Sequence, residues 1–267
     1  ACSRVRGSGW QSSGRQQRAA LAILGATKFL RGDRRGYEQA RERALSLNPG
    51  YGQFDVTVAE MAVQHRRYRE ALEHARRGLS VDSMSSSARA LIGLTELRLG
   101  QADVAQQTLQ AAFAADPFNV WVKNTLDLLD TYPQYVTRTS ERFELFMHER
   151  EADVLELYMS ELAEEAYEKL SQRYGARPQL PVRVEVYPNH GDFSVRTVGL
   201  AGLGALGVAF GNILALDSPS ARDPGEFNWG ATLWHEIAHA VTLEASAHRV
   251  PRWLTEGISV LEERRAR

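Results

Sequence analysis

Residues 84–117 read MSSSARALIGLTELRLGQADVAQQTLQAAFAADP, and the end of this stretch belongs to a series of segments that recur every 34 residues. The segments are Leu47-Asn48-Pro49, Val81-Asp82-Ser83 and Ala115-Asp116-Pro117, and each follows an apolar stretch with helical periodicity. Small residues recur with the same period, at Ala44, Gly78 and Ala112. This spacing predicts pairs of helices, because small residues allow close helix packing and proline cannot continue a helix.

The pattern resembles the tetratricopeptide repeat, with units at 16–49, 50–83 and 84–117. Equivalent positions are occupied by Gly32, Arg66 and Gly100, so the second unit lacks the glycine there. We expect 118–130 to form a capping helix and Tyr132-Pro133 to end an all-α domain over residues 1–135. The resemblance implies a concave surface for a protein partner, and the alternative is a spacer or a packing platform for the neighbouring domain.

Composition limits the classes of protein that the chain can belong to. Its 267 residues are 43% apolar and 24% charged, with a net charge of −1, which is ordinary for a globular protein and gives no general attraction to nucleic acid. No apolar run reaches the roughly 18 residues of a membrane span. The single cysteine, Cys2, excludes an internal disulfide. Its place near the N-terminus is compatible with a lipid-anchored, extracytoplasmic protein, or with no anchor at all.

Charge and periodicity both change near the middle of the chain. Residues 1–139 carry 19 Lys and Arg against 13 Asp and Glu, whereas the remainder carries 13 against 20. We therefore expect a second domain of α+β type over 136–267. Its predicted strands are 141–148, 181–187 and 208–216, and its predicted helices are 151–174, 228–245 and 252–265. The glycines of 199–207 precede a strand rather than join a strand to a helix, which argues against a dinucleotide-binding loop.

The chemistry is concentrated at His235-Glu236-Ile237-Ala238-His239, an HExxH motif within a predicted helix. Residues four apart lie on one face of a helix, so both imidazoles can bind one Zn²⁺. Glu236 is turned about 100° from His235, which places its carboxylate within reach of a metal-bound water as a general base. The apolar side of this helix indicates partial burial, where an unpaired pair of histidines would be costly.

A third ligand is expected from Pro251-Arg252-Trp253-Leu254-Thr255-Glu256-Gly257, on the following helix. Glu256 comes 17 residues after His239, and two histidines plus one glutamate form a known catalytic zinc set. We expect Trp253 to be a buried anchor for this helix, because its ring is large and apolar.

The run from Phe143 to Glu263 resembles the MA-like zinc metallopeptidases of the gluzincin group, and more closely bacterial proteins that join such a domain to tetratricopeptide repeats. The resemblance rests mainly on the two motifs above, together with the strand ending Ala215-Leu216-Asp217-Ser218-Pro219. It implies His235, His239 and Glu256 as zinc ligands and Glu236 as general base. It also implies that strand 208–216 forms a sheet edge over the cleft, where an added peptide strand could pair.

Further residues follow from this resemblance. The expected substrate-binding residues are Val208, Ala209, Phe210, Gly211 and Asn212 of the edge strand, His190 in the loop before Phe193, and Arg196. The favoured function is zinc-dependent hydrolysis of peptide bonds, with the repeats recruiting a protein partner. The rivals are a repeat scaffold with a relic peptidase domain and a protein with a structural zinc site. The intact set of ligands and base argues against a relic.

The sequence stops at Arg267, 11 residues after Glu256, whereas such peptidases usually continue with further helices. We therefore expect a domain that is truncated at its C-terminus. No Tyr or His follows Glu256, so a residue that stabilises negative charge on the reacting oxygen is expected upstream, at Tyr187 or His190, or beyond the last residue.

Overall fold

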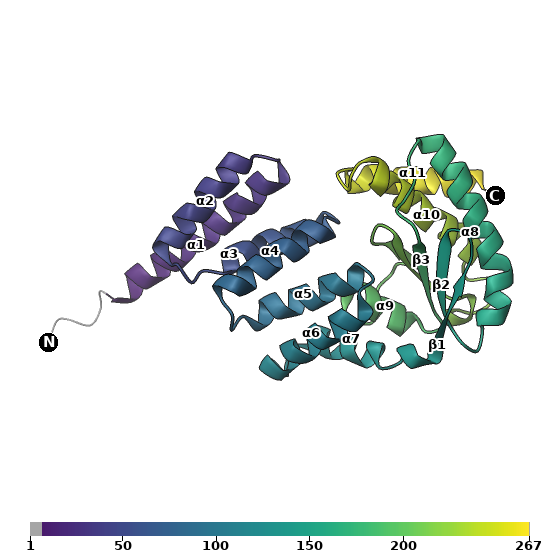
Figure 1. Ribbon diagram of the computed structural model, residues 1–267, viewed down its shortest axis with the longest axis horizontal. Helices are drawn as coiled ribbons and strands as arrows, with labels where there is room; N and C mark the ends of the chain where they lie inside the picture. Colours follow the sequence, from purple (N-terminus) through teal and green to yellow (C-terminus); the bar gives the residue numbers. More distant parts are fainter. Residues whose placement is uncertain (1–6, 267) are drawn as a thin grey trace.

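The computed structural model describes residues 7–266, with side chains from residue 14 onward (Figure 1). Cys2, on which the possibility of a lipid anchor rests, lies outside the described residues. No helix within the described part of the chain is long and apolar enough to cross a membrane.

Seven helices form the N-terminal array, and Figure 1 shows them stacked in sequence order, from purple to teal. They are α1 (Gly7–Leu30), α2 (Arg34–Leu47), α3 (Gln53–Gln64), α4 (Tyr68–Val81), α5 (Ser86–Arg98), α6 (Ala102–Ala115) and α7 (Val120–Leu129). The recurring small residues are buried between helices, and a Cβ added to Gly78 would lie 2.9 Å from the carbonyl oxygen of Gly52. Each predicted unit therefore contains one pair of closely packed helices.

The turn inside each helix pair contains a residue with left-handed backbone. These residues are Gly32, Arg66 and Gly100, with φ of 74°, 58° and 79°. Glycine adopts this conformation freely, whereas a residue with a side chain pays about 1–2 kcal/mol. Arg66 in the second turn therefore adopts the same left-handed conformation as the two glycines, at an energetic cost.

The second half of the chain is built on a mixed sheet of five strands in the order β1-β2-β3-β5-β4. The strands are β1 (Tyr135–Thr139), β2 (Phe143–His148), β3 (Val182–Tyr187), β4 (Gly207–Ala209) and β5 (Ile213–Asp217). The helices are α8 (Ala152–Tyr174), α9 (His190–Val198), α10 (Trp229–Ala245) and α11 (Arg252–Arg265), with short 3₁₀ turns at Tyr132–Gln134 and Pro219–Ala221. The central pairs β2–β3 and β3–β5 are parallel, and the outer pairs are antiparallel.

One face of the sheet packs against α8 and α10 and forms the larger core. Alternate residues of the central strands, such as Leu145, Val184 and Leu214, point into this core with the apolar side chains of both helices. The other face holds Phe146, Tyr187 and Ile213, which pack with Phe193 of α9 and with Tyr68 and Leu99 of the array. The predicted half-buried strands are therefore buried on both faces, because the array covers the face that the sequence pattern assigns to solvent.

The apolar run 208–216, predicted as one edge strand, is a β-hairpin. Gly211 has a φ of 99°, and the amide of Phe210 donates to the carbonyl of Ile213 at 2.8 Å. Gly211 and Asn212 thus form a two-residue turn, for which a glycine with positive φ is well suited. As a result only the β4 part of the predicted strand lies at an edge of the sheet, opposite the edge formed by β1, and β5 lies between β4 and β3.

Two other local predictions were wrong. His190, expected in a loop before Phe193, begins the helix α9, which is capped by the side chain of Asn189 accepting from the amide of Gly191 at 2.7 Å. Trp253 is 73% exposed instead of anchoring α11. That helix is held by buried Glu262, which accepts from Tyr174 of α8 at 2.7 Å and pairs with Arg173.

A buried ion pair joins the sheet, α9 and the array. The Nε of Arg196 donates to Glu185 Oε2 at 2.6 Å, and its Nη2 donates to the carbonyl oxygen of Leu97, in α5, at 2.9 Å. Both side chains of the pair are almost completely buried. Burial alone would raise the pKa of Glu185, but the charges of Arg196 and Arg183 hold that pKa below its usual value. Glu185 is therefore a buried carboxylate that depends on its cation.

Removal of this cation tests how far the joint depends on it. We expect R196M to lower the free energy of unfolding by up to about 3–5 kcal/mol, because the buried carboxylate of Glu185 would lose its closest cation and keep only Arg183 and the hydroxyl of Tyr187. The double variant E185L/R196M, which removes both charges, should recover most of the loss. Urea denaturation of the three proteins measures this, and equal stabilities of R196M and the double variant would contradict the explanation.

Candidate metal centre

The two motifs are brought together by a tight turn between α10 and α11. Helix α10 begins at Asn228, whose side chain accepts from the amide of Ala231 at 3.0 Å. After α10 the chain reverses through Ala247 and His248, which have φ of 48° and 59°. The reversal lays α11 back against α10 and turns Glu256 toward the histidines.

His235, His239 and Glu256 form the one group of possible metal-binding residues found within the described part of the chain, with ligand atoms all within 4.8 Å of one another. The two Nε2 atoms of the histidines are 3.1 Å apart. Glu256 Oε2 lies 3.2 Å from His239 Nε2 and 3.6 Å from His235 Nε2. All three candidate ligands predicted from the sequence therefore converge on one point.

The other nitrogen of each imidazole contacts an oxygen atom from α11. His239 Nδ1 lies 2.8 Å from Thr255 Oγ1, which is itself 2.7 Å from Thr242 Oγ1. His235 Nδ1 lies 3.4 Å from Glu263 Oε2. Such contacts orient metal-binding histidines and select the nitrogen that faces the ion. Thr255 was not among the predicted site residues, although it immediately precedes Glu256.

The cluster fits a zinc ion in both spacing and chemistry. Bonds of about 2.0–2.1 Å in a tetrahedron separate the ligand atoms by about 3.3 Å, close to the observed separations. Two imidazoles and a carboxylate are a donor set that catalytic zinc uses. With three protein ligands in place, one position of a tetrahedral ion would remain open.

Protonation also favours the forms that bind metal. Burial lowers the pKa of His239, which keeps the imidazole neutral. The hydrogen bond from His239, together with the charges of Arg66 and Arg252, lowers the pKa of Glu256 to about 2. Nη2 of Arg66 and Nε of Arg252 each lie 3.4 Å from Glu256 Oε1, which leaves Oε2 directed toward the histidines.

Glu236 lies beside this cluster in a different environment. Its side chain is buried, and its Oε2 has no hydrogen-bond partner among residues 14–266. Burial raises its pKa to about 8. Gly207 of β4 packs directly on it, since a Cβ at that position would lie 2.6 Å from Glu236 Oε1. The expected general base is thus a desolvated carboxylate under the edge strand, and a bound dication would lower its pKa again.

The expected substrate-binding residues of 208–212 are divided by the hairpin. Val208 and Ala209 lie in the edge strand, whereas Phe210, Gly211 and Asn212 line a cleft of about 740 Å³ between the array and α10. The cleft is also lined by Arg66, by Ala240 and Glu244 of α10, and by His248. These five residues therefore belong to two neighbouring surfaces instead of one strand.

The structure corrects the expectations for Arg196, His190 and Tyr187. Arg196 is buried against Glu185, so it has no access to a substrate carboxylate. His190 Nδ1 lies 2.8 Å from Asp217 Oδ2, and its Nε2 lies 2.7 Å from the carbonyl oxygen of Leu203. The hydroxyl of Tyr187 donates to Glu185 at 3.0 Å and is fully buried. All three side chains are committed to structural contacts.

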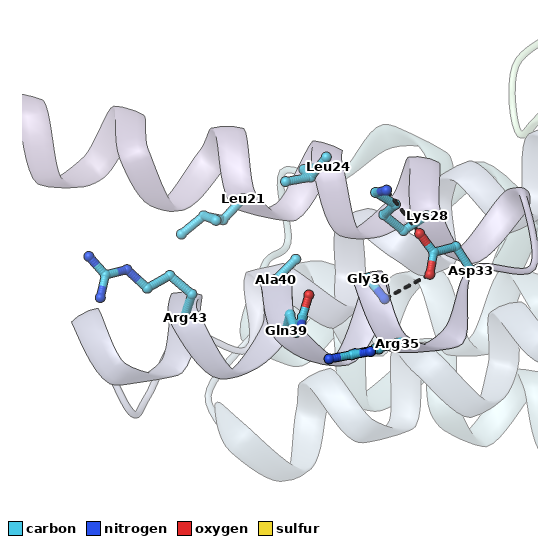
Figure 2. Close-up of a pocket in the computed structure, with 9 residues that line it drawn as sticks. All are labelled: Leu21, Leu24, Lys28, Asp33, Arg35, Gly36, Gln39, Ala40 and Arg43. Atoms are coloured by element: carbon cyan, nitrogen blue, oxygen red, sulfur yellow. Dashed lines mark hydrogen bonds and ion pairs between the residues drawn. The ribbon is translucent and has the colours of Figure 1, made fainter.

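A second hollow lies in the array, between α1 and α2, and has a volume of about 440 Å³ (Figure 2). Leu21 and Leu24 of α1 and the basic residues Arg35 and Arg43 of α2 line it. Within it Lys28 pairs with Asp33 at 2.9 Å, and Asp33 caps α2 by accepting from the amide of Gly36. This groove contains no metal-binding cluster and lies at the end of the array far from the sheet (Figure 1).

Comparison with known proteins gives only partial structural similarity. No family model matches the chain, and no curated protein matches it. A mutant of the O-GlcNAc transferase of Thermobaculum terrenum aligns at a TM-score of 0.34 and 19% identity, over 45% of this chain and 23% of the transferase chain. The second TPR domain of human RPAP3, in complex with an HSP70 peptide, aligns at a TM-score of 0.35 and 18% identity, over 44% of this chain and 98% of that domain. The aligned part therefore spans less than a quarter of the transferase, and these similarities assign no function.

Zinc titration tests the cluster and its support. We expect His239→Ala to abolish tight zinc binding, and Thr255→Val to weaken it about 10–100-fold because the imidazole loses its orienting partner. Competition with a chelating dye measures both affinities. Thr232→Val is the matched control, since Thr232 lies in the first turn of α10 and donates to Asn228 instead of contacting a histidine. Equal zinc affinity in the Thr255 and Thr232 variants would contradict the orienting role.

Proposed function

We propose that the protein is a zinc-dependent peptidase. The observation that supports this most is the convergence of His235, His239 and Glu256, next to the unpaired buried carboxylate of Glu236. A catalytic zinc has three protein ligands and an open position, whereas a structural zinc is closed by four. A cluster of three in the described chain therefore favours catalysis over a structural role.

Zinc, when bound, would lower the pKa of a water ligand toward about 7 and polarise a carbonyl group. Glu236 would take the proton from the attacking water and deliver it to the nitrogen of the bond that breaks. Burial raises the pKa of Glu236 and a bound dication would lower it, so the carboxylate could accept a proton in one transfer and release it in the next. His235, His239 and Glu256 would hold the ion while Thr255 keeps His239 in place.

The edge strand β4 supplies a surface for an extended peptide. The amide of Asp217 in β5 donates to the carbonyl oxygen of Leu206 at 2.9 Å, and the amide of Phe210 donates to the carbonyl oxygen of Ile213 at 2.8 Å. The peptide groups of Leu206 and Phe210 therefore point toward β5. Antiparallel pairing alternates, which turns the peptide groups of Gly207 and Ala209 away from β5. An added substrate strand would pair with these two residues, directly above Glu236.

We further propose that the helical array holds a protein partner. The groove between α1 and α2 combines the apolar side chains of Leu21 and Leu24 with the cationic Arg35 and Arg43. Such a surface suits a partner segment with both apolar and acidic residues. The array also packs on the sheet. It can therefore both recruit a protein partner and serve as a packing platform for the second domain.

Two carboxylate variants separate the roles at the metal. We expect Glu236→Gln to bind zinc normally but to lose about 10²–10⁴-fold in hydrolysis of a peptide library, because the proton acceptor is lost. Glu256→Gln should instead lose zinc affinity itself. Elemental analysis and cleavage assays on the same samples measure both effects. A wild-type protein that binds zinc and cleaves nothing would favour the relic scaffold.

A change at the edge strand tests the placement of the base. We expect Gly207→Ala to displace the carboxylate of Glu236, since the new Cβ would approach it at 2.6 Å, and to reduce turnover while zinc is retained. Gly204→Ala, in the same glycine-rich segment, is the control because a Cβ there meets nothing within 4 Å. Thermal unfolding of both variants checks folding, and equal turnover in the two would exclude the proposed position of the base.

A further inference from the structure

The turn between α3 and α4 of the array reaches the metal centre through one side chain. Arg66 approaches Glu256 Oε1 at 3.4 Å, and its side chain is only 16% exposed. Its Nη1 is buried and has no hydrogen-bond partner among the described residues 14–266. A cationic donor from the repeat array thus lies at the site with one nitrogen unused.

The backbone of Arg66 has a conformation that is unusual for a residue with a side chain. Its φ of 58° is left-handed, and the two equivalent turns use Gly32 and Gly100 for the same conformation. Arginine at this position is strained, and strain of this kind concentrates at functional sites. The turn that carries arginine is also the one in contact with the metal centre, where the ring of His248 interacts with its backbone.

The proposed chemistry is accelerated by a buried donor at the carbonyl oxygen, which neither Tyr187 nor His190 supplies. When water attacks a carbonyl carbon, the electrons of the C=O bond move to the oxygen, and preformed donors aimed at that oxygen accelerate the step. Glu236 and Glu256 are acceptors. The hydroxyl of Tyr187 already donates to Glu185. The ring of His190 is held by Asp217 and by the carbonyl oxygen of Leu203.

We propose that Arg66 donates a hydrogen bond to the substrate carbonyl oxygen as negative charge develops on it, so that the active site is completed by the repeat array. This inference rests on the proposed peptidase function. In the step, the water oxygen bonds to the carbonyl carbon, Glu236 accepts the water proton, and the oxygen of the former carbonyl carries the charge that faces Arg66. The C–N bond then breaks, the carbonyl is restored, and the nitrogen takes the proton from Glu236.

Arg66→Gly is the central variant, because glycine occupies the equivalent turns and should relieve backbone strain. At a saturating zinc concentration, which offsets loss of the contact between Arg66 and Glu256, we expect kcat to fall about 10²–10³-fold while KM and the thermal midpoint are maintained. Arg66→Lys, which keeps the charge but not the planar fork, should recover part of the loss. Arg31→Gln is the control, since Arg31 is an exposed arginine in the equivalent turn of the first helix pair, next to Gly32, and its effect should stay within about threefold.

A second measurement separates this inference from the peptidase function. The probe is a peptide phosphonate, in which a charged tetrahedral group replaces the carbonyl, titrated into the zinc-loaded proteins by calorimetry. We expect Arg66→Gly to bind it at least about tenfold more weakly than Arg31→Gln does. Absent turnover in the wild type with this difference present would reject the peptidase and keep the anion-binding role of Arg66. Equal phosphonate binding by Arg66→Gly and Arg31→Gln, no binding by the wild type, or normal turnover in Arg66→Gly would overturn the proposal.

Discussion

The arrangement of the two halves depends on the buried ion pair between Arg196 and Glu185. The guanidinium of Arg196 pairs with Glu185 of β3, lies 4.9 Å from the centre of the Phe210 ring and donates to Leu97 of the array. A charge removed from water is tolerated only when such partners surround it, so the array must be docked for the sheet to be stable in this form. The same docking brings the α3–α4 turn over the α10–α11 turn, and hence Arg66 to Glu256.

The candidate metal cluster is held in place for a related reason, because Glu256, its proposed third ligand, lies on a helix that is attached on two sides. Glu262 fixes α11 to α8, and Thr255 fixes it to Thr242 of α10. Glu256 lies between these attachments, with cations on one oxygen and histidines on the other. A ligand supported in this way loses little conformational freedom when a metal binds, which is how proteins obtain well-defined metal geometry.

Local signals in the sequence predicted the local structure well. The 34-residue period indicates the helix pairs, and the i, i+4 spacing of His235 and His239 places both imidazoles on one face. The hairpin was missed because the apolar residues on both sides of Gly211 and Asn212 fit one continuous strand. The Gly-Asn pair is itself a turn signal. The roles of Arg196 and Arg66 could not be predicted, because both depend on docking between segments far apart in sequence. For Arg66, the one signal in the sequence was an arginine at the position where the other two units have Gly32 and Gly100.

The position of Arg66 within the array limits how the number of repeats can change. The helix pair after it, α5–α6, meets the sheet through Leu99 and through Gly100, where an added Cβ would lie 2.9 Å from Ile213. Insertion or deletion of a unit between this turn and β1 would carry Arg66 away from Glu256 by the length of a whole repeat. Units added before α3 would leave that contact intact. Growth or loss of the array is therefore compatible with the metal centre only at its N-terminal end, where the groove between α1 and α2 lies.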